Sequence, residues 1–217
     1  VDERTGSFSH GSGLAGIKYS IATKSHIINT SFGTTISNRN VDCPEDQNEV
    51  GILDNLVKYD EEIRKLEAEL ADLNLDNTIW VASSGNCGVD LWDDSITEWP
   101  AELNHPNIVT VGSFMGGGRQ PKYNYGAVEI AAPYQAKVSF QGVFDGIVLR
   151  DETCSGTSVS GPYVAGTLAL MLASNSNFLN NPPLAIPVLY CNAKPHPSYQ
   201  YGTLDAGAAL SNQNQCQ

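Results

Sequence analysis

Apolar runs that end in glycine turns recur along the chain and predict the strands of a parallel sheet. Residues 27–33 (IINTSFG) and 79–88 (IWVASSGNCG) both show this pattern, and 108–112 (IVTVG) repeats it. Continuous rather than alternating hydrophobic runs are typical of strands that are covered on both faces. Because crossover connections are right-handed, we expect these three segments to be parallel neighbours in an α/β fold.

Between the first two predicted strands, apolar residues recur in steps of four and three. These residues are Ile52, Leu56, Tyr59, Ile63, Leu66, Leu70 and Leu73. This spacing predicts a helix with one apolar seam and a charged face, within a helical insertion at about 45–75. We expect a crossover helix that packs its seam on the sheet, and a partner-binding or dimerising helix is the alternative.

Residues 156–166 (GTSVSGPYVAG) place a serine at the start of a helix rich in small residues. Pro162 fits only a first helical turn, and Gly156 permits a close backbone approach just before it. A helix that begins near Ser158 directs its unpaired N–H groups and the positive end of its dipole at charge developing beside the hydroxyl. The segment favours a serine nucleophile, and a packed Gly/Ala helix with an incidental serine is the alternative.

Segments 27–33, 79–88 and 156–166, in this order along the chain, resemble the subtilisin-like serine peptidases (subtilases). Further matching segments are 108–112, 128–133 (VEIAAP) and 201–209 (YGTLDAGAA), so the resemblance extends over roughly residues 11–210. It implies a single three-layer α/β domain over residues 1–217, with a mainly parallel sheet and with N-terminal strand and helix units shortened or lacking.

The same resemblance implies the roles of several residues. Ser158 matches the family's nucleophile and Asn86 matches its oxyanion-hole asparagine. Ser31, Phe32 and Gly33 match a strand that lines the substrate cleft. The activity implied is hydrolysis of peptide bonds by acyl transfer.

Two alignments compete for the N-terminal residues. One sets residues 10–17 (HGSGLAGI) on the family's histidine motif and makes His10 the general base, but it requires deletion of a strand and a helix before Ile27. The other sets Gly11, Ser12 and Gly13 on an edge segment that binds the main chain of the substrate, followed by a helix over residues 14–24. This second alignment needs only a short gap.

The remaining candidates for the triad histidine and aspartate are weak. His26 and His105 precede their strands and therefore lie at the amino edge of the sheet, whereas ligands bind at the carboxyl edge. His196 lies in a proline-rich loop, and Asp2 has only Val1 before it.

The start of the chain bears on the missing base. Because the sequence starts with Val1 rather than methionine and shows no basic stretch followed by an apolar one, we expect a processed product or a cut portion of a longer chain. We therefore expect a peptidase whose aspartate and histidine come from an N-terminal companion chain unless His10 serves. An inactive relative that acts as a binding or regulatory protein is the alternative.

Composition narrows the range of partners. The formal net charge of −12 argues against nucleic acids and anionic membranes, and no apolar run reaches the ~18 residues of a membrane span. The family resemblance favours a secreted or extracytoplasmic location.

Cysteines and acidic residues give weaker indications. Five cysteines, without a zinc-binding spacing, leave at least one thiol free and leave open a bridge between Cys87 and Cys154. No cofactor is certain. Asp90, Asp93 and Asp94 offer oxygen ligands suited to calcium, which many subtilases bind, although a solvated acidic loop is the simpler interpretation.

Overall fold

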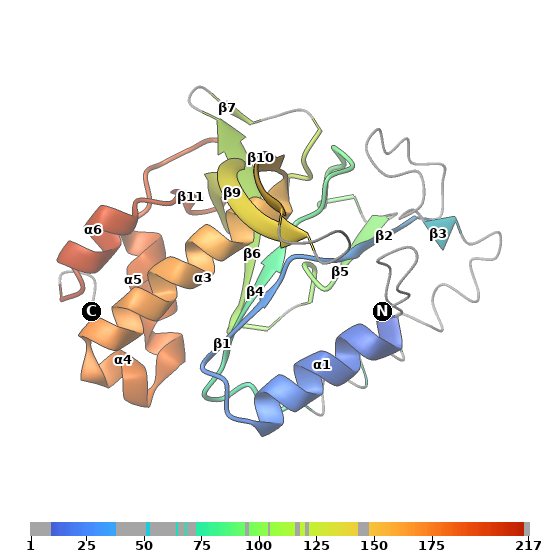
Figure 1. Ribbon diagram of the computed structural model, residues 1–217. Helices are drawn as coiled ribbons and strands as arrows, with labels where there is room; N and C mark the ends of the chain where they lie inside the picture. The colour runs from blue at the N-terminus through green and yellow to red at the C-terminus, as the bar shows by residue number, and fades with distance from the viewer. Residues whose placement is uncertain are drawn as a thin grey trace.

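A parallel sheet forms the centre of the molecule (Figure 1). The computed structural model describes residues 10–37, 51–52, 64, 68, 73–93, 96–103, 105–115, 118–119, 122–142 and 148–214. The order of the parallel strands is β1 (Ile27–Thr30), β4 (Ile79–Ser83), β6 (Ile108–Met115), β8 (Ile130–Pro133) and β11 (Gly202–Thr203). A short strand, β7 (Gly118–Arg119), returns antiparallel to the end of β6.

The three strands expected to be parallel neighbours are adjacent in the sheet. Ile27 of β1 pairs with Ile79 of β4, and Trp80 of β4 pairs with Ile108 of β6. Every residue of β4 is buried, as its continuous apolar run predicts. The predicted parallel core is confirmed.

Helices cover both faces of this sheet and make three layers. Helix α3 (Thr157–Ser174) packs Val164 and Leu168 in one core cluster with Val81 of β4. Helix α1 (His10–Ala22) packs Ile17 in a second cluster with Trp80, the neighbour of Val81. Because successive strand residues point to opposite faces, α1 and α3 lie on opposite sides of the sheet (Figure 1).

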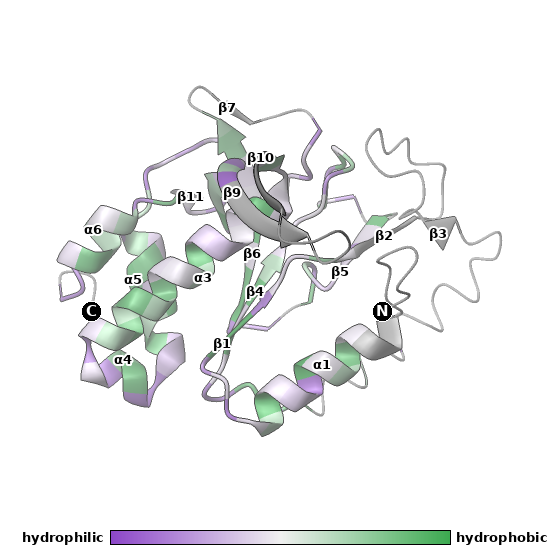
Figure 2. Cartoon of the chain, in the orientation of Figure 1, coloured by the Kyte–Doolittle hydropathy of each residue, from purple (hydrophilic) through white to green (hydrophobic). Residues whose placement is uncertain are grey.

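The C-terminal helices surround the far end of α3. They are α4 (Ser176–Asn180), the 3₁₀ helix η1 (Pro182–Leu184), α5 (Ala185–Cys191) and α6 (Ala206–Ser211). Phe178, Val188 and Leu189 complete the cluster that holds α3 against the sheet. Hydrophobic residues accordingly concentrate along the central strands and the buried faces of α3 and α5 (Figure 2).

Two small sheets stand beside the central one. β9 (Gln135–Gly142) and β10 (Val148–Ser155) form an antiparallel hairpin that leads into α3. β2 (Thr34–Ser37) continues from the end of β1 and pairs with β3 (Gly51–Ile52) and β5 (Ile96–Trp99).

Two local predictions are corrected by the structure. The helix begins at His10 rather than at residue 14, and it includes Gly11, Ser12 and Gly13. Packing against the sheet extends it, because Gly13 and Leu14 are both buried. Ile52 was predicted to be the first residue of the seam helix. It lies instead in β3, where it pairs with Ser37 of β2, and this strand pairing overrides the helical period.

The remainder of the predicted seam helix lies almost entirely outside the described residues. Arg64 and Ala68 are helical and exposed, and the exposure of Arg64 agrees with the polar face predicted there. Leu73 is in irregular structure, partly buried against the α1 side of the core.

Candidate active site

Ser158 lies in the first turn of α3, at the carboxyl edge of the sheet. The helix predicted to start near it begins at Thr157. Gly156 immediately precedes the helix with φ 132°, a region that favours glycine, and its N–H donates to the carbonyl oxygen of Tyr134 at 2.9 Å. The half-buried Ser158 therefore stands where a rigid glycine turn meets a helix N-terminus.

The Ser158 hydroxyl forms a reciprocal pair with the end of β1. Its Oγ donates to the carbonyl oxygen of Ser31 at 3.1 Å, and Ser31 Oγ donates to the carbonyl oxygen of Ser158 at 3.0 Å. Asn29 Nδ2 in turn donates to Ser31 Oγ at 2.9 Å. This pairing fixes the Ser158 side chain and points its hydroxyl proton at a carbonyl oxygen.

Asn86 reaches the same turn from the end of β4. Its Oδ1 accepts two hydrogen bonds from Thr157, one from the backbone N–H and one from the hydroxyl, each at 3.0 Å. Asn86 Nδ2 has no hydrogen-bond partner within the described part of the chain. Because Oδ1 is held by Thr157, the Asn86 amide is fixed next to the residue that precedes Ser158, and its Nδ2 remains available as a donor.

Thr157 joins β4 and the loop that follows it to the helix, and the sequence analysis did not identify it. Its hydroxyl also accepts from the N–H of Gly85 at 3.2 Å, and its carbonyl oxygen accepts from Ser83 Oγ at 3.0 Å. The only sequence feature that could have identified Thr157 is its position between Gly156 and Ser158.

Close approach of α3 to the sheet depends on Gly161. A methyl group at this position would lie 2.9 Å from Asn29 Oδ1 and 3.2 Å from Ser83 Oγ. One turn of α3 therefore sits directly on the polar ends of β1 and β4, which keeps Ser158 in register with Asn86.

The segment expected to line a substrate cleft leaves β1 next to Ser158. Ser31, Phe32 and Gly33 are half-buried, and the Phe32 ring lies 6.3 Å from that of Trp99, centroid to centroid. Gly11, Ser12 and Gly13 are helical, so they present no extended edge of the kind expected for the pairing of a substrate main chain.

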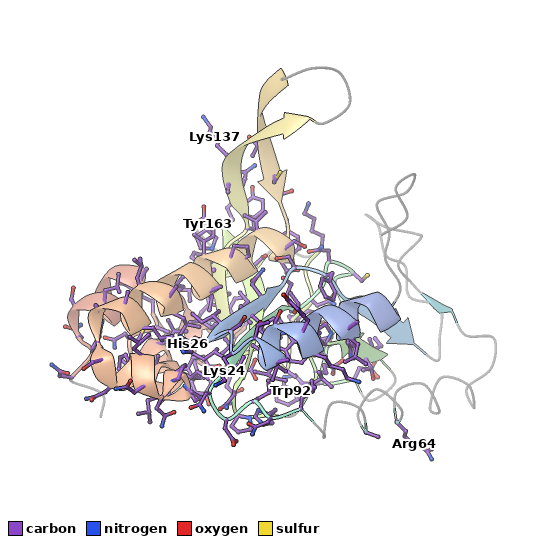
Figure 3. All side chains as sticks on the ribbon, turned by 60° about the horizontal axis from the view of Figure 1, so that its bottom comes forward. Lys24, His26, Arg64, Trp92, Lys137 and Tyr163 are labelled. Carbon is purple, nitrogen blue, oxygen red and sulfur yellow. The ribbon has the colours of Figure 1, made fainter. Side chains whose placement is uncertain are left out.

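Histidines were considered as the base, and the structure places three of them away from Ser158. His26 immediately precedes β1, at the amino edge of the sheet, and lies near Lys24 and away from Lys137 of the β9–β10 hairpin (Figure 3). His105 Nδ1 accepts from the Asn107 N–H, and His196 Nδ1 from the Ser198 N–H.

These contacts agree with the structural roles expected for His26, His105 and His196. His10 opens α1, across the sheet from α3, and its side chain lies outside the described residues.

The cysteine pairing left open by the sequence is corrected. Cys154 is a free thiol, whereas Cys87 and Cys191 each take part in a disulfide. A bridge between Cys87 and Cys154 is therefore wrong.

The described residues contain no group of three or more histidine, cysteine or acidic side chains arranged to hold a metal ion. Asp90 Oδ1 accepts from the Trp92 N–H at 3.1 Å in a local turn, and Asp94 lies outside the described part. Within the described ranges, no helix combines the length and apolar character that crossing a membrane requires.

Comparison with known families decides the affiliation of this site. A family model described as the subtilase family matches residues 3–195. The chain belongs to the subtilase family. No curated protein sequence matches it.

Solved structures with the same fold are proteases. A lanthipeptide protease has 20% sequence identity and a TM-score of 0.69, and the match covers 99% of this chain and 68% of that chain. The epidermin leader peptide processing serine protease EpiP from Staphylococcus aureus has 24% identity and a TM-score of 0.64, with coverages of 94% and 54%. The protease domain of PatA has 22% identity and a TM-score of 0.60, with coverages of 94% and 65%. The chain thus spans just over half to about two thirds of the length of these three.

Proposed function

We propose that this chain carries the nucleophile of a subtilisin-like serine peptidase that hydrolyses peptide bonds. The observation that carries the proposal is the pair of contacts at the start of α3, where Thr157 holds the Asn86 amide and the hydroxyl of the adjacent Ser158 donates to Ser31. Membership of the subtilase family and the protease folds of the neighbouring structures support it.

In the proposed reaction, Ser158 Oγ attacks the carbonyl carbon of the scissile bond. A base takes the proton that Oγ now donates to Ser31, and the carbonyl oxygen becomes an oxyanion. Asn86 Nδ2 and the Ser158 N–H donate to this oxyanion, because neither has an acceptor within the described residues. The amine leaves with a proton from the base, and water then hydrolyses the acyl-enzyme.

The base and its orienting acid are proposed to come from a companion segment beside β1. Within the described part of the chain β1 pairs only with β4, so its other edge has unpaired backbone groups, and Asn29 is exposed there. Such an edge is a template for another strand. A parallel strand added at this edge would end beside Ser31, and therefore beside the hydroxyl of Ser158.

His10 is the alternative base within this chain. It lies at the start of a helix on the opposite face of the sheet from α3, which supports the companion segment instead. The base matters because loss of the histidine or the serine lowers turnover by about 10⁶ in a subtilisin, a member of the same family.

The substrate is proposed to be a peptide or protein bound in extended form. Ser31, Phe32 and Gly33 leave β1 at the level of the nucleophile and offer backbone groups to a substrate strand, which is β-augmentation.

Turnover by native protein tests the proposed activity. Hydrolysis of a fluorogenic peptide library is expected for the native protein, with loss to background for Ser158→Ala. Ser176→Ala, an exposed serine at the start of α4, is the matched control and should keep full activity. Equal hydrolysis by Ser158→Ala would refute the assignment of the nucleophile.

Adding the missing strand tests the companion. A catalytic-domain fragment that supplies the aspartate and histidine segments should bind this chain and raise its turnover by orders of magnitude. If the isolated chain is already fully active and His10→Ala abolishes that activity, the base is His10 and the companion proposal fails.

A further inference from the structure

The carboxylate of Glu98 lies against two glycines next to the nucleophile. Glu98, in β5, is 3% exposed. A methyl group on Gly33 would lie 2.5 Å from Glu98 Oε1, and a methyl group on Gly85 would lie 2.8 Å from Oε2. The two carboxylate oxygens therefore touch the backbones of two different segments, and any larger residue at either position would displace the carboxylate.

These two glycines belong to the segments that flank Ser158. Gly33 follows Ser31, whose carbonyl oxygen accepts the Ser158 hydroxyl, and Gly85 precedes Asn86. The strands that lead into them, β1 and β4, are parallel neighbours and end at the same edge of the sheet. The Glu98 carboxylate thus lies between the two backbone segments that border the nucleophile.

Asn124 orients this carboxylate. The fully buried Asn124 donates from Nδ2 to Glu98 Oε2 at 3.4 Å and to the Ser84 carbonyl oxygen at 2.7 Å. Its Oδ1 accepts from the N–H groups of Cys87 and Val89. One side chain therefore fixes the loop that carries Asn86 and the position of Glu98 together.

A second acidic residue lies beside Glu98. The backbone N–H of Glu98 donates to the carboxylate of Glu102. A carboxylate placed beside a binding segment favours a cationic group over a neutral one of the same size.

We propose that Glu98 binds the cationic side chain of the residue on the acyl side of the scissile bond, so that the peptidase prefers lysine or arginine there. This inference rests on the proposed function. A carbonyl held between Ser158 Oγ and Asn86 Nδ2 has its own α-carbon between the Ser31 and Asn86 segments. The side chain on that carbon extends along Gly33 and Gly85, where the backbone carries no side chain, and a long, unbranched cationic side chain reaches the carboxylate.

Matched substrates isolate the charge. Two fluorogenic peptides that differ only by lysine or norleucine before the scissile bond have nearly the same length, but only lysine carries an ammonium group. The native protein should show a kcat/KM for the lysine peptide about 10²-fold above that for norleucine, since a site built for a polar group discriminates strongly against its absence. In Glu98→Gln the ratio should fall to near one, mainly through loss on the lysine peptide.

The control variants separate charge from folding. Glu102→Gln removes the neighbouring carboxylate and should keep most of the lysine preference. The ratio of kcat/KM for the two peptides is taken within each variant, so a general loss of activity in Glu98→Gln cancels, and Glu98→Asp, which keeps the charge on a shorter side chain, should keep part of the preference. Equal kcat/KM on both peptides, or a lysine preference that survives in Glu98→Gln, would overturn the assignment while leaving Ser158 as the nucleophile.

Binding provides the test if the protein shows no turnover that depends on Ser158, in which case the proposed function fails separately. Fluorescent peptides that end in lysine or norleucine are titrated into native protein and Glu98→Gln, and anisotropy reports Kd. Tighter binding of the lysine peptide, lost in Glu98→Gln, supports the Glu98 site. Equal Kd values for the two peptides would overturn it.

Discussion

Individual hydrogen bonds decide what Asn86 and Ser158 are able to do. Thr157 occupies the acceptor of the Asn86 amide with two bonds, and this leaves the Nδ2 donor beside the nucleophile. The Ser158 hydroxyl donates to the Ser31 carbonyl oxygen, and in the proposed reaction a base takes this proton. The proposed nucleophile and oxyanion donor are thus positioned by neighbours that do not themselves react.

Removing the Asn86 amide should lower turnover without unfolding the protein. Asn86→Ala is expected to reduce kcat by about 10² to 10³, the loss found for the equivalent donor in a subtilisin, with little change in KM. Thr157→Val should reproduce part of this loss, because Asn86 loses one of its two tethers, and Thr157→Ser should restore it. Unchanged kcat in Asn86→Ala would remove Asn86 from the mechanism.

At this scale the sequence predicted the positions of Ser158 and Asn86, because a residue type and its place in a motif coincide there; their catalytic roles stay predictions. Ser158 and Asn86 follow a glycine turn and a buried strand, so parallel pairing predicts that they meet, and the structure brings both to Thr157. Glu98 and Asn124 were missed because nothing in a polar segment shows that one of its carboxylates or amides is buried. Burial depends on tertiary packing.

At the scale of elements, the packing of helix α3 on β1 and β4 sets the position of Ser158 relative to these strands. Its glycines have different environments: Gly161 faces Asn29 and Ser83, whereas Gly166 has no atom within 4 Å of an added methyl group. Both lie in the same helix, so intrinsic helix propensity affects them alike.

This contrast makes a matched pair of alanine substitutions. Gly166→Ala should stabilise the protein by up to about 1 kcal/mol through helix propensity. Gly161→Ala should be destabilising by roughly 1–3 kcal/mol, because the methyl group pushes α3 from β1 and β4 and separates Ser158 from Asn86. Chemical denaturation measures both, and a stabilising Gly161→Ala would contradict the packing described.

The element predictions failed where tertiary contacts outweighed local pattern. The parallel strands expected within 27–33, 79–88 and 108–112 are present as β1, β4 and β6, because a buried parallel strand has a continuous apolar run. Ile52 fits a helical period but lies in β3, and the glycine-rich start of α1 is helical despite its low propensity. Cross-strand pairing and sheet packing supply the stabilisation that these sequences lack.

Over the whole molecule, charge and burial make stability depend on pH. Burial raises the pKa of Glu129 above 4.5, although its Oε2 accepts from the Thr110 N–H at 2.8 Å and this bond lowers the pKa in part. The Ala208 N–H, followed by Lys194, lowers the pKa of Asp205 below 3.8. The two carboxyls therefore contribute to the pH dependence with opposite sign.

Glu129→Gln should change the pH profile in a defined direction. Native Glu129 holds its proton longer than the unfolded chain does, so its stabilising contribution is complete below pH 4.5 and is lost as the pH rises through the raised pKa. Unfolding free energy measured against pH should therefore fall less above pH 4.5 in Glu129→Gln than in the native protein. Asp205→Asn is the opposite control, since the contribution of Asp205 is present above pH 3.8 and lost as the pH falls below it.

At the scale of the whole molecule, the sequence predicted the architecture but left the source of the catalytic base open. The layered α/β sheet and the subtilase affiliation were both correct. The proposed source of the base, a companion strand beside β1, is a long-range pairing for which neither periodicity nor composition is informative.

The most direct test of an activated Ser158 is covalent labelling. Native protein is treated with a fluorophosphonate probe, and the adduct is located by peptide mass, with Ser158→Ala as control. The proposed function predicts an adduct on Ser158 that is absent from the variant and that strengthens when the companion segment is added. Absence of an adduct on folded native protein, with and without that segment, would contradict an activated Ser158 and with it the peptidase assignment.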